Sequence, residues 1–431
     1  MQRKIFTLSA IILTIFWVYE AVLLYTYATD VPFWDTWEQL PRGEHKHLFE
    51  FYNENMQFFY FLISEVIYKT TNWNLRWFNF INFVLYTILL LVYWKILYEA
   101  QKQKRVPFYP LFLGALLTPM LGYNWLWPVL VQTHTFILFF LLSIYWGYTC
   151  DKEKYSPYAC GICLFLSIIS MNIPLALGGC IAYTVKEIVN AKQQGKITCL
   201  KKCTKMLITL IVLFGGLACV TNVRQFITIK LSNNIWTLEY IYNLAFYTIN
   251  SLSLFYLADI INWKISLMWF VIHFSILAVV FFEQYRDKKI QSLWGILFGV
   301  LFCVCGIVSF RGGEVYSYHL GFIRHNETTF MLLPATLMVL FLSRKKWVRY
   351  YAVCLMVLMF YGIASDIRAQ RFQFFGKLFY QNGCLCLNHY YNLKTIDTWQ
   401  CTMNFPVAPD QWMEKGKEKN LSFIKTIEHC Q

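Results

Sequence analysis

The sequence predicts an all-α polytopic membrane protein. Of its 431 residues, 58% are hydrophobic and only 14% are charged, whereas soluble proteins carry about a quarter charged residues. Apolar runs recur along the whole chain at about twenty residues each, the length that a helix needs to cross a hydrocarbon core of ~30 Å. The first run, Ile5–Tyr27, is too long for the apolar part of a signal peptide and lacks a small-residue cleavage site, so we expect no cleavage there.

About eleven segments are apolar enough to be transmembrane helices. They cover residues 5–27, 77–98, 108–124, 133–149, 156–171, 173–187, 206–222, 264–282, 292–309, 329–343 and 349–364. The two short segments on either side of Met171-Asn-Ile-Pro174 could instead form a re-entrant pair, which would leave the direction of every later span unchanged. The spans define a membrane domain over residues 1–364, followed by a tail over residues 365–431.

The charged residues predict which loops face the cytoplasm. If the N-terminus is cytoplasmic, every inside loop is rich in lysine and arginine, whereas basic and acidic residues balance on the other side. This asymmetry is what the positive-inside rule requires. It also explains the net charge of +14 by topology, because the basic residues form short clusters between spans and no nucleic-acid-binding face. The tail is then extracytoplasmic.

The fourteen cysteines show no zinc-binding spacing, and those inside apolar segments are expected to be small hydrophobic residues. Four cysteines fall in the tail, where an oxidising compartment favours disulfides. Cys384 and Cys386 are separated by one residue and are not expected to pair with each other. The pairing among the four is left open: Cys384, Cys386, Cys401 and Cys430.

The long first outer loop, residues 28–76, carries two acids beside the membrane, Asp35 and Glu38. Further along, residues 47–67 have apolar side chains at helical spacing and polar ones, including Glu54, on another face. This pattern predicts an amphipathic helix at the interface, which could equally be a plain spacer. His45 and His47 could bind a metal ion with a carboxylate, although two histidines in a solvated loop usually have no such role.

Other extracytoplasmic segments also carry polar side chains near the membrane. Gln132 and His134 begin a span and are expected to face the bundle interior, because lipid exposure would be costly. Arg311, Arg324 and His325 flank one loop, where arginine could bind a lipid-linked phosphate or reach ordinary lipid headgroups. We also expect one or two interfacial or re-entrant helices within residues 224–262 and a short helix within 412–423 that packs back onto the membrane domain.

Four short motifs resemble the GT-C class of membrane glycosyltransferases, and in plan the phage-type O-antigen glucosyltransferases. They are Phe33-Trp-Asp35-Thr-Trp37, Tyr52-Asn-Glu54-Asn-Met-Gln57, the Trp-x-Trp followed by Gln132, and Phe310-Arg311-Gly312. Two positions depart from the family pattern. Asn55-Met56 replace a basic residue after the Asn-Glu element, and Arg324-His325 stand where the family has Arg-Tyr.

The resemblance implies an inverting transfer of a sugar from a polyprenyl-phosphate carrier to a cell-surface glycan or lipopolysaccharide, outside the bacterial inner membrane. Asp35 would be the general base. Glu38, Glu54 and Gln132 would orient the acceptor, and the donor phosphate would be bound by Arg311, Arg324 and His325. No nucleotide or protein cofactor is implied, and a divalent metal ion is left open. A polyprenyl-phosphate sugar synthase and a flippase would act upstream.

Two other functions compete with the glycosyltransferase. An O-antigen polymerase or ligase is also a many-span protein with arginine in its outer loops, but its main polar loop lies in the middle of the chain. A lipid-linked-sugar flippase or transporter would carry ionisable residues within its spans and internal repeats. The sequence shows few such charges and no evident repeat.

Overall fold

The computed structural model describes most of the chain. The described residues are 2–30, 48, 51–52, 55–101, 106–119, 125–150, 155–170, 173–220, 237–252, 263–311, 328–378, 384, 388 and 410–428. The expected catalytic stretch and most of the loop between the two expected phosphate-binding arginines lie outside these residues.

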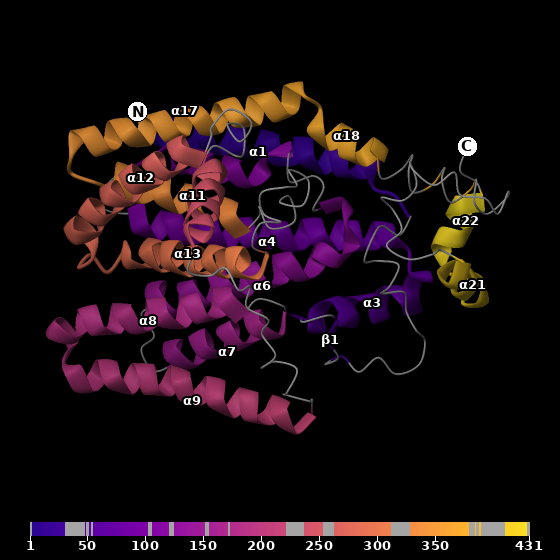
Figure 1. Cartoon of the computed structure of the whole chain (residues 1–431), viewed down its shortest axis with the longest axis horizontal. Coiled ribbons are helices and arrows are strands. Elements are labelled where there is room, and N and C mark those ends of the chain that lie inside the picture. The colour runs from indigo at the N-terminus through magenta and orange to yellow at the C-terminus, as the bar shows by residue number, and fades with distance from the viewer. Residues whose placement is uncertain are drawn as a thin grey trace.

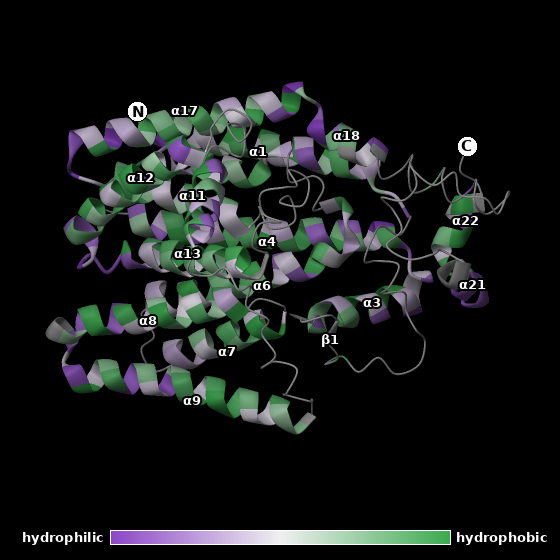
Figure 2. Cartoon of the chain, in the orientation of Figure 1, coloured by the Kyte–Doolittle hydropathy of each residue, from purple (hydrophilic) through white to green (hydrophobic). Residues whose placement is uncertain are grey.

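The described part of the chain is a bundle of long helices (Figure 1). Six helices are long and apolar enough to cross a membrane: α1 (Gln2–Tyr27), α4 (Leu75–Gln101), α9 (Lys196–Val220), α12 (Trp263–Gln284), α13 (Gln291–Arg311) and α17 (Lys346–Arg368). Figure 2 shows hydrophobic residues along these helices and hydrophilic residues at their turns. An α-helical membrane protein is therefore confirmed, although six helices of full length are fewer than the eleven spans expected.

Shorter or irregular helices occupy the remaining expected spans. They are η1 (Tyr109–Leu117), α6 (Val131–Ile144) with the π turn η4 (Tyr145–Thr149), α7 (Ser156–Ile169), α8 (Ile173–Gln194) and α16 (Leu332–Phe341). The segment η1 is a 3-10 helix with a proline in its first turn. The residues before and after the Met171-Asn-Ile-Pro174 break form two separate helices, α7 and α8, which pack against each other and against α9.

Further short elements belong to the described part of the chain. They are η3 (Pro128–Leu130), α11 (Leu238–Leu252), α18 (Arg371–Leu378), α21 (Asp410–Glu418) and α22 (Ser422–Glu428). The helix α11 confirms one of the helices expected within 224–262. The short tail helix was expected as one segment, and the structure divides it into α21 and α22.

The amphipathic helix expected over residues 47–67 begins later than predicted. The first part of the expected helix is replaced by two short strands of two residues each, β1 (Phe51–Tyr52) and β2 (Asn55–Met56), which pair antiparallel. The helix α3 (Phe58–Thr71) follows and ends at Asn72 in the left-handed conformation. Apolar residues at helical spacing do not exclude a strand when aromatic residues dominate, and Phe51 and Tyr52 favour extended backbone.

The bundle has two chemically different ends (Figure 1). One contains the start of α1 and the turns α8–α9, α12–α13 and α16–α17, and we name it the basic end. The other contains α3, α18, α21 and α22, and we name it the tail end. The turns α8–α9, α12–α13 and α16–α17, which were expected inside, lie at the basic end, and the tail helices α21 and α22, which were expected outside, lie at the opposite end.

Helices α8 and α13 approach each other closely through glycines. A methyl group added at Gly178 in α8 would lie 2.8 Å from the carbonyl oxygen of Gly299 in α13, and one added at Gly306 in α13 would lie 2.7 Å from the Pro174 side chain in α8. Small residues permit such close packing of membrane helices, where dispersion forces replace the hydrophobic effect. These glycines fix the distance between α8 and α13.

We therefore expect Gly178→Ala to destabilise the protein by about 1–3 kcal/mol, because the added methyl group meets backbone atoms that cannot move aside. The measurement is the midpoint of thermal unfolding in detergent. Gly216→Ala is the matched control, since no atom lies within 4 Å of the added group on this exposed helical face. An equal fall in both midpoints would contradict the close-packing account.

Candidate functional site

Polar side chains form a buried layer within the tail end of the bundle. They come from the N-terminal halves of α4 and α6, the residue after η1, the C-terminal parts of α1 and α17, and the start of α18. All of them are buried except the α18 residue, Arg371, whose side chain is 40% exposed. Polar groups are costly inside a membrane bundle unless they are paired, and they commonly mark functional sites. We name these side chains the polar layer: Glu20, Asn82, Thr118, Gln132, His134, Asp366 and Arg371.

His134 and Asn82 form one part of the layer. The His134 Nδ1 and Asn82 Oδ1 atoms are 3.0 Å apart, and the Asn82 amide donates to the Trp127 carbonyl at 3.3 Å. Gln132 and His134 are both buried, as the sequence predicted. Among the described residues, the Gln132 Oε1 atom has no hydrogen-bond partner. It is therefore a buried acceptor available to a water molecule or a ligand hydroxyl.

Two carboxyl groups form the other part of the layer. Asp366 accepts a hydrogen bond from Thr118 at 2.7 Å and forms an ion pair with Arg371, with 3.1 Å between Nε and Oδ1. Glu20 is fully buried and lies close enough to Asp366 for their charges to repel. Neither Glu20 oxygen has a hydrogen-bond partner in the described part of the chain. The layer thus combines an arginine with two acids.

Trp125 joins the two parts. Its ring packs against Tyr86 at 5.4 Å between centroids and against Phe372 at 6.1 Å, and Phe372 directly follows Arg371 in α18. The buried indole nitrogen of Trp125 has no acceptor within the described residues. The layer therefore contains an unmatched donor, an unmatched amide oxygen and an unmatched carboxyl, which together could bind a polar molecule.

The sequence interpretation did not identify Glu20, Asp366 and Arg371. Glu20 is an acid within the first apolar span, and an ionisable residue in that position is a recognised signal of function. Asp366 and Arg371 were assigned to the tail, because the last span was expected to end at residue 364. Helix α17 in fact continues to Arg368 and places Asp366 inside the bundle.

Most of the predicted site residues lie outside the described residues, namely Asp35, Glu38, Glu54, Arg324 and His325. Arg311 is the last residue of α13, and its side chain is also outside the described set. Of the predicted set, the structure therefore places only Gln132 in atomic detail.

Asp30 fixes the beginning of the predicted catalytic loop. Its buried carboxylate accepts from the backbone N–H of Leu75 at 2.7 Å, from the Ser422 hydroxyl at 2.5 Å and from the Thr426 hydroxyl at 3.4 Å. Burial raises the pKa of Asp30, and the hydrogen bonds from Ser422 and Leu75 oppose part of that rise. One side chain therefore joins the end of α1, the start of α4 and the tail helix α22.

Further contacts attach the tail to the same place. The Ser422 N–H donates to the Asn72 carbonyl at 2.8 Å, and the Phe423 and Trp73 rings are 6.2 Å apart. Cys384 is disulfide-bonded, so the expected disulfide in the tail is present, although its partner lies outside the described residues. The tail thus packs back on the membrane domain, as predicted.

Metal-binding residues do not cluster in the parts of the chain that the structure describes. No group of three His, Cys, Asp or Glu side chains there could hold a metal ion. His45 and His47 are not among those residues. The described residues therefore provide no ligands for the divalent metal ion that the sequence interpretation considered.

Asp30→Ala should release the tail helices from the bundle. The substitution leaves the Leu75 N–H and the Ser422 hydroxyl without their charged acceptor, which should weaken tail docking by about 1.5–3 kcal/mol. The measurement is the rate of limited proteolysis between residues 410 and 428, which should rise in the variant. Glu65→Ala, which removes an exposed acid, is the control. Equal proteolysis of Asp30→Ala and the natural chain would exclude Asp30 as the anchor.

Comparison with known proteins gives no family for this chain. No protein-family model, no curated protein and no solved structure matches it. Its function must therefore be inferred from its own residues and their arrangement.

Proposed function

We propose that this protein is an inverting glycosyltransferase that moves a sugar from a polyprenyl-phosphate carrier to a glycan or lipopolysaccharide acceptor at the extracytoplasmic face. The observation that carries the proposal is the Asp30 anchor. It holds the residue before the Val31–Glu38 stretch at the tail end of the bundle, the same end as the buried polar layer. The stretch that carries the predicted base, Asp35, therefore follows a residue that is fixed at this end of the bundle.

In the proposed reaction, Asp35 accepts the proton of an acceptor hydroxyl as the hydroxyl oxygen attacks the anomeric carbon. The bond between that carbon and the phosphate oxygen breaks, and the lipid phosphate leaves with the electron pair. Arg311, Arg324 and His325 would stabilise the growing negative charge on the phosphate. One displacement of this kind inverts the configuration of the anomeric carbon.

The described polar layer suggests how the acceptor is held. The Gln132 Oε1 atom and the Trp125 indole N–H are a buried acceptor and a buried donor, suited to sugar hydroxyls. Glu38 and Glu54 are further candidates for the same role. Arg371 lies at the same end and is held by Asp366, which makes it an additional candidate for binding an anion.

Asp35→Asn should lower sugar transfer by about 10²–10⁴-fold, because an amide cannot accept the hydroxyl proton. Membranes containing equal amounts of each protein would be given radiolabelled undecaprenyl-phosphate hexoses, and label in the glycan fraction would be measured. Glu65→Gln, at an exposed acid near the same end, is the control and should retain activity. Full activity of Asp35→Asn would exclude Asp35 as the base.

Glu20 favours a second function, the transport of a lipid-linked sugar. A fully buried carboxyl in a membrane helix, close to a second carboxyl, is a feature of proton-coupled and cation-coupled transporters. An ionised carboxylate without a partner is costly to bury. Glu20 would therefore hold a proton or a cation, and exchange of that ion could be coupled to movement of the substrate.

Glu20→Gln separates the two functions. Proteoliposomes would carry a fluorescent undecaprenyl-phosphate sugar, and its movement between leaflets would be followed with and without a pH gradient. A transporter should show gradient-dependent movement that Glu20→Gln abolishes and Asp35→Asn leaves unchanged. If the natural protein moves no lipid in this assay, the transport function is wrong.

A further inference from the structure

A mainly apolar groove runs between α8 and α13 near the basic end of the bundle, and we name it the α8–α13 groove. The described residues that line it come from η4, α8, the end of α12 and α13. Ala182 in α8 lies one turn after Gly178, and Gly295 in α13 lies one turn before Gly299. The groove therefore begins beside the place where glycines hold the two helices in contact.

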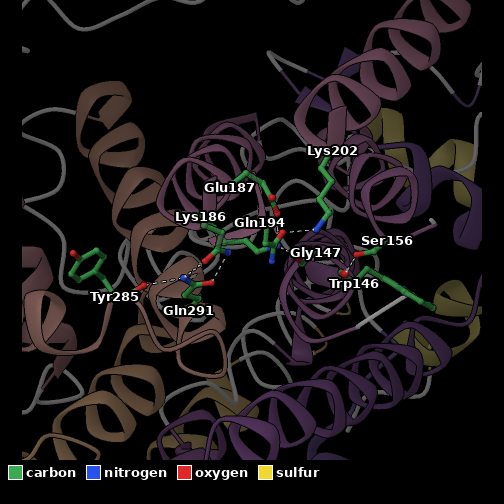
Figure 3. Close-up of polar contacts among 10 residues, drawn as sticks. Trp146, Gly147, Ser156, Lys186, Glu187, Gln194, Lys202, Tyr285 and Gln291 are labelled. Carbon is green, nitrogen blue, oxygen red and sulfur yellow. Dashed lines mark hydrogen bonds and ion pairs between the residues drawn. The ribbon is translucent and has the colours of Figure 1, made fainter. Parts of the chain in front are cut away.

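Five of the lining residues carry polar groups, and three of these residues have partners. Lys186 donates to the Gly147 carbonyl and to Glu187 Oε1, both at 2.6 Å. The Gln291 amide donates to the Tyr285 carbonyl at 2.9 Å, and the Tyr285 hydroxyl accepts from a neighbouring arginine at 2.7 Å. Figure 3 shows the contacts of Lys186 and Gln291. These three lining residues are held by the protein itself.

The other two polar residues of the groove, Tyr148 and Trp294, carry donors that lack acceptors. Within the parts of the chain that the structure describes, neither the Tyr148 hydroxyl nor the Trp294 indole nitrogen has a hydrogen-bond partner, and both atoms are buried. The whole Trp294 residue is only 6% exposed. Because a buried donor without an acceptor is unfavourable, these two groups indicate that an acceptor from outside the chain binds here.

The two unmatched donors belong to neighbouring side chains. A methyl group added at Gly295 would lie 3.0 Å from the Tyr148 hydroxyl oxygen, and Gly295 directly follows Trp294. The glycine thus lets the hydroxyl reach the backbone of α13 beside the indole. The Trp294 ring packs against Phe281, with 5.1 Å between ring centroids, and this contact holds the indole in place.

The size and depth of the groove limit the acceptor. The groove has a volume of about 20 Å³, and a space of roughly 10–15 Å³ holds one water molecule. It therefore admits a single oxygen atom of a larger ligand, and no lipid headgroup. Trp294 lies in the first turn of α13, one of the helices long enough to cross a membrane. The end of a span lies at the membrane interface, where the ester linkages of lipids also lie.

The surroundings of the groove suit a hydrocarbon chain. Val185 and Phe298 line it and are 38% and 41% exposed, so they offer apolar surface outside its narrow interior. A carbonyl oxygen carries two lone pairs and no hydrogen, which makes it a fitting acceptor for two donors. A polyprenyl chain has no such oxygen, whereas each acyl chain of a diacyl glycerolipid begins with one.

We propose that the α8–α13 groove binds a diacyl glycerolipid, with one ester carbonyl accepting hydrogen bonds from the Trp294 N–H and the Tyr148 hydroxyl. The acyl chain of that ester lies over Val185 and Phe298. The headgroup stays outside the groove, and its charge is not part of the recognition. This inference does not depend on the proposed glycosyltransferase activity, and the groove lies at the opposite end of the bundle from the polar layer.

The test compares dioleoyl phosphatidylcholine with its ether-linked counterpart, in which a methylene group replaces each ester carbonyl. The full chain in mixed micelles would be given equal amounts of both lipids, and native mass spectrometry would measure how much of each stays bound. The natural protein should retain the ester lipid about tenfold more, because each neutral hydrogen bond changes an equilibrium by about two- to tenfold. Equal retention would overturn the proposal, since the donors would then bind water or another acceptor.

Two conservative variants test the donors separately. Trp294→Phe removes the indole N–H and keeps an aromatic ring, and Tyr148→Phe removes only a hydroxyl. Each should lower the preference for the ester lipid to about threefold or less and leave retention of the ether lipid within about twofold. The matched control is Trp347→Phe, at a tryptophan in the first turn of α17 that is 50% exposed and does not line the groove.

The control should keep the tenfold preference. A thermal unfolding midpoint in detergent would establish that each variant is folded, and Tyr148→Phe keeps the test decisive if Trp294→Phe does not fold. If a folded variant of either donor kept the full preference, that side chain would not bind the carbonyl, and the two-donor site would be wrong.

Discussion

A helix bundle in hydrocarbon has to satisfy its polar groups from within, and this constraint explains where the polar side chains of this protein lie. Along α8 and α13, glycines let the helices touch directly. Several buried amide side chains donate to backbone carbonyls that lie outside regular helical hydrogen bonding. Asn82 uses the Trp127 carbonyl at the tail end, and Gln291 uses the Tyr285 carbonyl at the basic end.

The described polar side chains differ between the two ends of the bundle. The polar layer at the tail end contains two buried acids with one arginine, and its aromatic neighbours are Tyr86, Trp125 and Phe372. At the basic end, Lys186 pairs with the buried Glu187, and the amides of Asn190 and Gln291 exchange hydrogen bonds.

The helical membrane fold could be predicted from the sequence because hydrophobicity and loop charge are averaged over whole segments. An error of a few residues at one helix end therefore does not change the predicted fold. The burial of Gln132 and His134 was predicted from the cost of exposing them to lipid. The sequence interpretation missed Asp366 because the hydrophobic segment ends at residue 364, whereas helix α17 continues to Arg368. The ion pair between Asp366 and Arg371 depends on this additional helical turn. The sequence interpretation also mistook the paired strands at Phe51–Met56 for helix, since helical spacing alone does not exclude extended backbone.

The Asp30 anchor joins residues that are made at very different times. Ser422 follows Asp30 by 392 positions, and at ~5–20 residues per second a ribosome needs roughly 20–80 s to add them. During that interval α1 is already in the membrane, but the carboxylate lacks its hydroxyl partners from α22. The loop that follows Asp30 can reach its anchored position only after the tail has been synthesised and moved to the same face. Biogenesis itself therefore delays assembly of the tail end until the other helices are in place.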